Sequence, residues 1–170
     1  QGGHLQRARD LYEQVLRRHP EHADALHLLG VVEYAQGNHG RAVERISQSV
    51  AGHPDNPAAR LNLGNALRAT GRLAEALAQY DAALALNAHY GNALVAKAVA
   101  LDELDRWNES LACFSEALAL QGDSATTYFN RGNGYRKRCQ WTQAIADYYL
   151  ALTLQPGFVH ALLNRGSAYH

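Results

Sequence analysis

A small residue returns every 34 positions along most of this chain, and this interval constrains the fold more than any other feature. Glycine stands at Gly30, Gly64, Gly132 and Gly166, and Ala98 takes the one remaining place. We call these five the small positions. The neighbouring residues repeat as well: LNLGN around Gly64 returns as FNRGN around Gly132 and as LNRGS around Gly166. An internal repeat of this length indicates that one supersecondary unit is stacked on the next.

Apolar spacing within each interval predicts two helices, and an alanine- and leucine-rich composition supports that assignment. We call the first helix of a repeat A and the second B. The A helices are expected at roughly 23–36, 57–70, 91–104, 125–138 and 159–170, and the B helices at roughly 5–18, 40–51, 74–86, 107–120 and 141–154. The chain therefore starts on a B helix and ends on an A helix.

Turn residues between the helices agree with this division. Asn56 before a proline is a typical N-cap. Gly37 and Gly71 follow A helices, where a left-handed residue is needed to close the turn. Asp105 and Cys139 stand at the equivalent places. We therefore expect those two turns to close in another way.

The small positions are predicted to lie where an A and a B helix approach most closely, because a larger side chain would hold the backbones apart. Large residues recur on the B helices at a matching register. They are expected to fill the space between successive repeats, and they are Tyr12, Ile46, Tyr80, Phe114 and Tyr148.

The period of 34, with alanine, an aromatic residue and alanine at fixed offsets after the small position, resembles the tetratricopeptide repeat (TPR) family. The resemblance implies an all-α fold, a right-handed superhelical solenoid of antiparallel helix pairs whose A helices line the concave side. It also implies one domain over residues 1–170. Its parts would be a half repeat at 1–22, four full repeats at 23–56, 57–90, 91–124 and 125–158, and the first helix of a further repeat at 159–170.

Composition excludes several classes of function. Sixteen basic and sixteen acidic residues give a net charge of zero, whereas nucleic-acid binders usually carry a basic surplus. No apolar run reaches membrane-spanning length, and no catalytic, phosphate-binding or metal-binding motif is present. We expect a non-catalytic protein without cofactor, metal, nucleic acid or membrane insertion. A cytoplasmic location and a truncated N-terminus are also expected.

One stripe of each A helix is expected to form a binding surface. Residues two before and one after the small position lie on a face that differs from the packed one. In the TPR family that stripe faces the groove, so the resemblance assigns peptide binding to its members. They are Leu28, Val31, Asn62, Asn65, Ala96, Val99, Asn130, Asn133 and Asn164, joined by the basic residues Arg136 and Lys137.

The asparagines in this stripe allow two interpretations. Asparagine is a mediocre residue inside a helix, so its recurrence needs a reason. An amide both donates and accepts, and can hold a peptide backbone of any sequence; asparagines do so in TPR chaperone adaptors and in the TPR arm of O-linked N-acetylglucosaminyltransferases. Alternatively, the amides bridge adjacent A helices. Leu61 and Phe129 replace lysines of the chaperone-binding clamp, so an acidic chaperone tail is not an expected ligand.

Opposite charges recur one repeat apart near the end of two A helices. The matching offsets place Asp102 opposite Arg136 and Glu103 opposite Lys137. We interpret these as neutralising pairs across a repeat boundary. The alternative is a charged end of the groove that selects acidic ligand residues.

The sequence therefore predicts a scaffold that binds a peptide or partner segment in a concave groove. The alternative is the substrate-recruiting TPR arm of a larger enzyme, such as a glycosyltransferase of the O-GlcNAc type. The partner's identity does not follow from the sequence. The uncovered terminal half repeats, including Leu162 and Tyr169, suggest fraying or self-association.

Overall fold

A computed structural model describes residues 2–168, with side chains from residue 4 onward, and these residues form helices and turns without any strand. The predicted helices are all present, with ends within a few residues of the expected ones; residues 169 and 170, including Tyr169, lie outside the described part. The helices are α1 (Gly2–Arg18), α2 (Ala23–Ala35), α3 (His39–Gly52), α4 (Pro57–Ala69), α5 (Leu73–Leu86), α6 (Gly91–Glu103), α7 (Trp107–Gln121), α8 (Ala125–Lys137), α9 (Trp141–Leu154) and α10 (Val159–Ser167).

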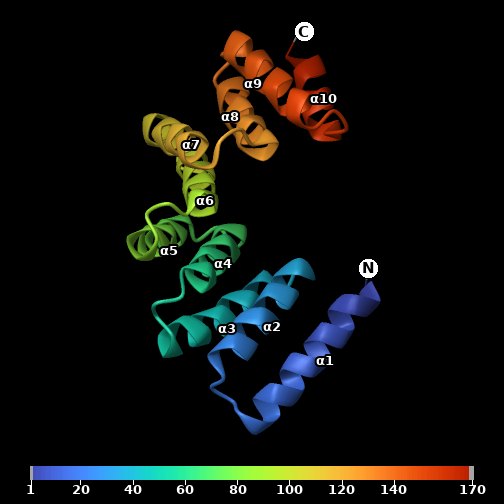
Figure 1. The fold of residues 1–170 in the computed structure, drawn as a ribbon, viewed down its shortest axis with the longest axis vertical. Helices are drawn as coiled ribbons and strands as arrows, with labels where there is room; N and C mark the ends of the chain where they lie inside the picture. Colours follow the sequence, from blue (N-terminus) through green and yellow to red (C-terminus); the bar gives the residue numbers. More distant parts are fainter. Residues whose placement is uncertain (1, 169–170) are drawn as a thin grey trace. The chain divides into compact units, whose positions relative to one another are not determined.

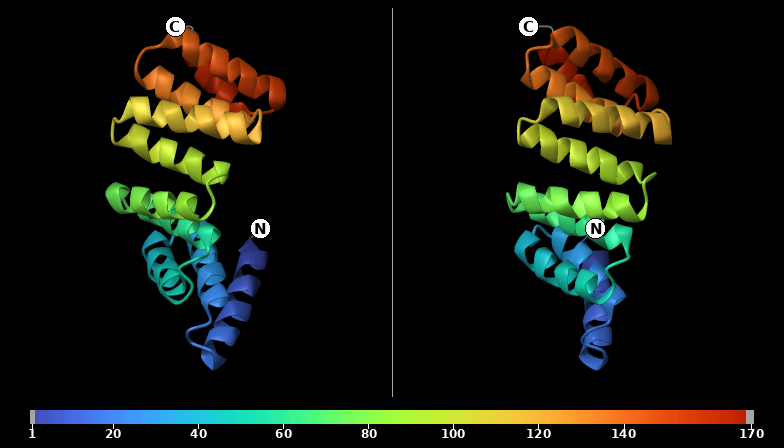
Figure 2. Two further views of the ribbon diagram at one scale, coloured as in Figure 1. Left: turned by 60° about the vertical axis from the view of Figure 1, so that its left-hand side comes forward. Right: turned by 90° about the vertical axis from the view of Figure 1, so that its left-hand side faces the viewer.

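The chain divides into two compact units, Gln1–Ala93 and Leu94–His170, and each is described by itself. The first holds α1 to α5 and the start of α6; the second holds the rest of α6 with α7 to α10. The A and B helices of one repeat pack as a hairpin, as α2 and α3 do in the first unit and α8 and α9 in the second (Figures 1 and 2).

Close helix approach explains the glycines at the small positions. A Cβ at Gly132 would lie 2.8 Å from Cε1 of Tyr148, and one at Gly64 would collide with the ring of Tyr80. At Ala98, the small partner Ser110 donates from Oγ to the Ala98 carbonyl at 2.8 Å. The close approach predicted from the sequence is confirmed at these positions.

The large B-helix residues occupy a different place from the one expected. Tyr80 and Tyr148 are fully buried, and each ring lies against the glycine of its own repeat. They therefore fill the space between the A and B helices of one repeat, where the absent glycine side chain leaves room. The prediction placed these side chains between successive repeats, whereas the rings of Tyr80 and Tyr148 lie against the glycines of their own repeats.

Four turns after A helices close in the same way. Asp105 and Cys139 have φ of 60° and 56°, close to the 81° and 77° of Gly37 and Gly71. In each turn the next backbone N–H donates to a carbonyl in the last turn of the helix at 2.8 to 3.0 Å. The expectation of a different closure is wrong. This hydrogen bond forms only when the residue before the donating N–H has a positive φ, whatever its side chain is.

Side chains cap the starts of α4 and α8. Asn56 Oδ1 accepts from the Ala59 N–H at 3.0 Å, which confirms the predicted N-cap. Ser124 Oγ accepts from the Thr127 N–H at 3.3 Å. These bonds satisfy donors that a helix end leaves free.

Two buried ion pairs join neighbouring helices. Arg131 on α8 donates to both oxygens of Asp147 on α9 at 2.8 and 2.7 Å. Arg9 on α1 pairs with Glu33 on α2, whose second oxygen accepts from Asn38 at 2.8 Å. Asp147 and Glu33 are only 3% and 4% exposed, so loss of either cation would strand a buried carboxylate.

Candidate peptide-binding surface

The first unit gathers three of the predicted groove residues around one hollow. Val31 on α2 and Asn62 and Asn65 on α4 line it, together with Tyr34 and Ile46. The last two were not predicted as site residues. Tyr34 could have been found, because it lies one turn after Val31 on the same helix face.

The walls of this hollow are mostly apolar, and two of its lining residues, Asn62 and Asn65, carry side-chain amides. Ile46 is fully buried, while Val31 and Tyr34 are half-buried. The Tyr34 ring lies 4.9 Å from the His39 ring, which supports its orientation. Such a hollow can take a short apolar side chain while amides beside it hydrogen-bond a backbone.

Asn62 is held by a buried histidine. Its Nδ2 lies 2.8 Å from Nε2 of His27, which joins α4 to α2. Burial lowers the pKa of His27, and the nearby Asp24 carboxylate partly opposes that shift. The imidazole is therefore neutral at neutral pH, and with its proton on Nδ1 its Nε2 accepts from the Asn62 amide.

Asn65 is held by its own repeat. It accepts through Oδ1 from the Tyr80 hydroxyl at 3.0 Å. Both amides of the hollow are thus bonded inside the unit, and each retains donor or acceptor capacity beyond that one bond.

In the second unit the predicted asparagines form a small cluster. Asn133 Oδ1 accepts from the Tyr148 hydroxyl at 2.8 Å and from Asn164 Nδ2 at 2.7 Å. Burial raises the pKa of Tyr148, while hydrogen bonds with Arg136 and Asn164 act against that shift. Asn130 is half-buried, and its side chain has no hydrogen-bond partner among the residues that the structure describes.

The remaining groove residues contribute apolar surface. Leu28 on α2 is 41% exposed in the first unit. Ala96 and Val99 on α6 are half-buried in the second. The described structure therefore brings together Val31, Asn62 and Asn65 in one unit and Asn133, Asn164 and Arg136 in the other.

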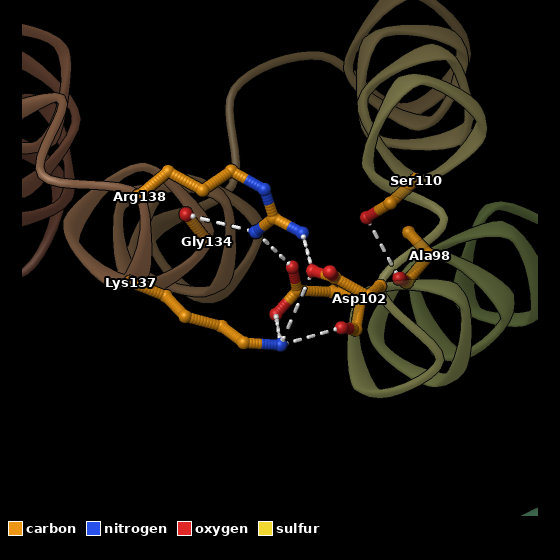
Figure 3. A network of polar contacts seen from close by, with 7 residues as sticks. Ala98, Asp102, Ser110, Gly134, Lys137 and Arg138 are labelled. Atoms are coloured by element: carbon orange, nitrogen blue, oxygen red, sulfur yellow. Dashed lines mark hydrogen bonds and ion pairs between the residues drawn. The ribbon is translucent and has the colours of Figure 1, made fainter.

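The charged pairs involve different partners from those predicted. Arg138 bonds to both Asp102 and Asp105, and Lys137 Nζ donates to the Asp102 carbonyl at 2.8 Å (Figure 3). The predicted pairing of Asp102 with Arg136 is wrong, because Arg138 takes that place. The Arg138 guanidinium lies over the Trp107 ring, 4.4 Å from its centre, and from there its fork reaches both carboxylates.

These contacts neutralise the basic end of α8 within the second unit. The interpretation that these charges neutralise one another is therefore confirmed, although Asp102 pairs with Arg138 instead of Arg136. Lys137 Nζ also lies 4.0 Å from the Asp102 carboxylate and 3.9 Å from that of Asp105. Lys137 is consequently a poor candidate for selecting an acidic ligand.

Within residues 2–168, no helix is long and apolar enough to cross a membrane, and no three histidine, cysteine, aspartate or glutamate side chains gather in a possible metal site.

Stacked helix hairpins of this length, with a small residue at each closest approach, define a helical-repeat protein. A family model described as "Tetratricopeptide repeat" matches residues 1–45 and 32–90, more than half of the chain. The chain belongs to the tetratricopeptide repeat family. No curated protein matches its sequence.

Solved structures share the fold. A thermophilic TPR protein of Thermus thermophilus, TTC0263, is 23% identical and superposes with a TM-score of 0.83, over 98% of this chain and 91% of that one. YrrB, described as a TPR protein with an unusual peptide-binding site, is 21% identical with a TM-score of 0.75, over 96% and 84%. MamA is 20% identical with a TM-score of 0.77, over 89% of each chain.

Proposed function

We propose that this chain is a non-catalytic interaction module that binds an extended peptide, or an extended segment of a partner protein, on the A-helix face of its first unit. The observation that carries the proposal is the hollow lined by Val31, Asn62 and Asn65, since three residues of the expected binding stripe converge there. A partner side chain would enter the hollow, and the partner backbone would lie across the two amides.

The amides are well prepared for this role. Asn62 is fixed by His27 and Asn65 by Tyr80, so neither side chain has to lose much rotamer freedom when a ligand binds. An amide can donate to a backbone carbonyl or accept from a backbone N–H. Binding would therefore depend weakly on the ligand's sequence at those points.

Specificity would come from the apolar wall. Val31 and Ile46 offer no charge and no hydrogen-bonding group, so the entering side chain should be short and aliphatic. Exposed Leu28, one turn before Val31, extends the apolar surface along α2. A peptide with two aliphatic residues fits this pattern better than an acidic one.

The TPR family membership and the peptide-binding site described for YrrB support a binding module of this kind. The identity to YrrB is 21%, so the position of the site rests on the hollow itself.

The test is selection from a displayed peptide library against the 170-residue chain, followed by measured affinities. The expected peptides carry a short aliphatic residue and lose at least about tenfold in affinity for Val31→Arg, which fills the hollow with a charge. Leu28→Glu, at an exposed site, should also weaken binding. Leu86→Arg on α5, at a side chain that is 45% exposed, is the matched control and should bind as the parent does. Equal affinities for all four folded proteins would refute the proposed site.

A further inference from the structure

His27 is a polar residue at a position that is apolar in the other A helices. It stands three residues before Gly30, and it is only 8% exposed. The residues at the same place in the other A helices are Leu61, Val95, Phe129 and Leu163. Burying an imidazole costs free energy unless the ring is hydrogen-bonded, and His27 bonds to Asn62. The cost of burying His27 is therefore offset by a contact with the proposed binding surface.

Asn62 depends on this histidine because its other neighbour cannot accept a hydrogen bond. Three periods later, Asn164 donates from Nδ2 to Oδ1 of Asn133 at 2.7 Å. Val31 stands where that acceptor would be for Asn62, and an isopropyl group accepts nothing. His27 supplies the acceptor instead, with Nε2 at 2.8 Å from Nδ2 of Asn62.

Asn130 shows the same position without either acceptor. Valines stand at both places, Val99 where Asn133 would be and Val95 where His27 would be. Within the described part of the chain the Asn130 side chain makes no hydrogen bond. Its amide can therefore turn in either direction, whereas the bond with His27 holds that of Asn62 in one.

The two bonds at the hollow determine which atom each amide offers to a ligand. With Nδ2 turned to His27, Asn62 keeps Oδ1 to accept. With Oδ1 engaged by the Tyr80 hydroxyl at 3.0 Å, Asn65 keeps Nδ2 to donate. The hollow therefore combines an acceptor and a donor, which a ligand backbone matches with one N–H and one C=O.

We propose that His27 is the positioning residue of this surface: the neutral imidazole holds Asn62 Oδ1 available to a ligand N–H, and the imidazolium reverses the amide. The proposal rests on the proposed function, since it concerns the same hollow. A protonated ring carries an N–H on both nitrogens, so Nε2 and the Asn62 Nδ2 would be two opposed donors. Half a turn of the amide relieves this by presenting Oδ1 to the ring. The ligand N–H then meets a donor and loses its hydrogen bond.

The other charged groups on the helices packed against α2 are engaged elsewhere or exposed. Asp24 lies one turn before His27, and its carboxylate raises the pKa of the imidazole against the larger effect of burial. On α1, Arg9 pairs with a glutamate of α2. On α4, Arg60 donates to a loop carbonyl and to a glutamine of α5, and Arg68 lies in the last turn. The charged residues of α3 are exposed, and they are Arg41, Glu44 and Arg45.

NMR on the ligand-free 170-residue chain tests the positioning directly. At about pH 7.5 the ring ¹⁵N signals of His27 should show a neutral imidazole with its proton on Nδ1. On acidification, the Asn62 side-chain amide signals should change with the same midpoint as the His27 ring, while those of Asn65 stay in place. A proton on Nε2 at about pH 7.5, or Asn62 amide signals that do not change before the chain unfolds, would overturn the proposal.

Binding of a library-selected peptide provides the second test. Its affinity should fall about three- to tenfold as His27 is protonated, which corresponds to one neutral hydrogen bond. His27→Gln keeps an acceptor that does not titrate, so it should bind like the parent at about pH 7.5 and remove this pH dependence. His53→Gln, at an exposed histidine after α3, is the matched control and should keep the parent's pH profile.

His39 is the other histidine beside the hollow, because its ring lies 4.9 Å from that of Tyr34. A pH profile flattened by His39→Gln but unchanged by His27→Gln would therefore overturn the proposal. Ester oxygens that replace the peptide N–H groups one at a time identify the bond itself. One replacement should weaken binding about three- to tenfold at about pH 7.5, and the loss should shrink once His27 is protonated.

The proposed function and the role of His27 fail in different ways. Peptide affinity unchanged by Val31→Arg would remove the hollow as the site. A peptide whose binding is weakened by Val31→Arg, but whose pH profile is the same for the parent and for His27→Gln, would leave the site in place and remove only the role of His27.

Discussion

The Tyr80 hydroxyl donates to Oδ1 of Asn65 at 3.0 Å, and two repeats later the Tyr148 hydroxyl donates to Asn133 at 2.8 Å. Asparagine thus stands on the A helix where the buried B-helix residue carries a hydroxyl that needs an acceptor. Where that residue lacks a hydroxyl, the A-helix position is valine, as for Val31 with Ile46 and Val99 with Phe114. At the position one after the small residue, the alternation of amide and apolar residues therefore follows the core.

This relationship predicts energetic coupling between Asn65 and Tyr80. Asn65→Val removes the acceptor of a buried hydroxyl and should cost about 1–3 kcal/mol of unfolding free energy, and Tyr80→Phe about 0.5–1.5 kcal/mol. The double variant should lose less than the sum, by at least about 0.5 kcal/mol. Urea unfolding of the four proteins gives the coupling energy; strictly additive losses would contradict the bond's role.

Gly64 and Gly40 provide a contrast in helix packing. Gly64→Ala pushes a Cβ into the Tyr80 ring and should destabilise by about 1–3 kcal/mol, and Gly64→Leu by more. Gly40 is helical with open space around it, so Gly40→Ala should be neutral or stabilising by up to about 1 kcal/mol. Thermal unfolding measures both. Similar melting temperatures for the two alanine variants would remove the packing role assigned to Gly64.

Removing one partner of the buried pair of Arg131 and Asp147 should lower the free energy of unfolding strongly, whereas replacing both partners should lower it little. Arg131→Leu leaves the carboxylate without its cation and should cost about 3–5 kcal/mol. Adding Asp147→Gln installs the residues of an earlier repeat, Leu63 and Gln79, and should recover most of that loss. A double variant no more stable than Arg131→Leu, by chemical denaturation, would contradict this account.

His27 should make stability depend on pH. Its pKa is lowered below the ordinary 6.5 in the folded state because burial penalises the imidazolium. The unfolded chain therefore binds a proton first, and stability falls as the pH drops below about 6.5 towards the lowered pKa, while above that range this histidine adds no pH dependence. His27→Gln should flatten the unfolding free energy between about pH 7 and about pH 5 relative to the parent. Parallel profiles would show that His27 does not contribute.

Much of the fold follows from the sequence because the helical signals recur at one interval. The small positions and the Asn56 cap are local or periodic features, and the structure confirms them. The left-handed conformation of Asp105 and Cys139 was not predicted. Glycine is the residue that usually adopts this conformation, but the hydrogen bonds of these turns require it of any residue that stands there.

The candidate site was less predictable, since it depends on contacts between helices. Register alone brings Asn62 near α2, but only side-chain geometry identifies His27 as its partner. The partner of Asp102 was misassigned because an arginine side chain is long enough to leave its register. Arg138 is one repeat after Leu104, yet it bonds to Asp102 and Asp105 while it lies over Trp107.

The most direct test of the proposed binding surface is a ¹⁵N NMR titration of the chain with a selected aliphatic peptide. We predict that the largest backbone shift changes fall on α2 and α4, around Val31, Asn62 and Asn65, and that the Asn62 and Asn65 side-chain amide signals move with them. Shift changes confined to α1 or to α7–α10, with the signals of Val31, Asn62 and Asn65 unmoved at saturation, would contradict the account.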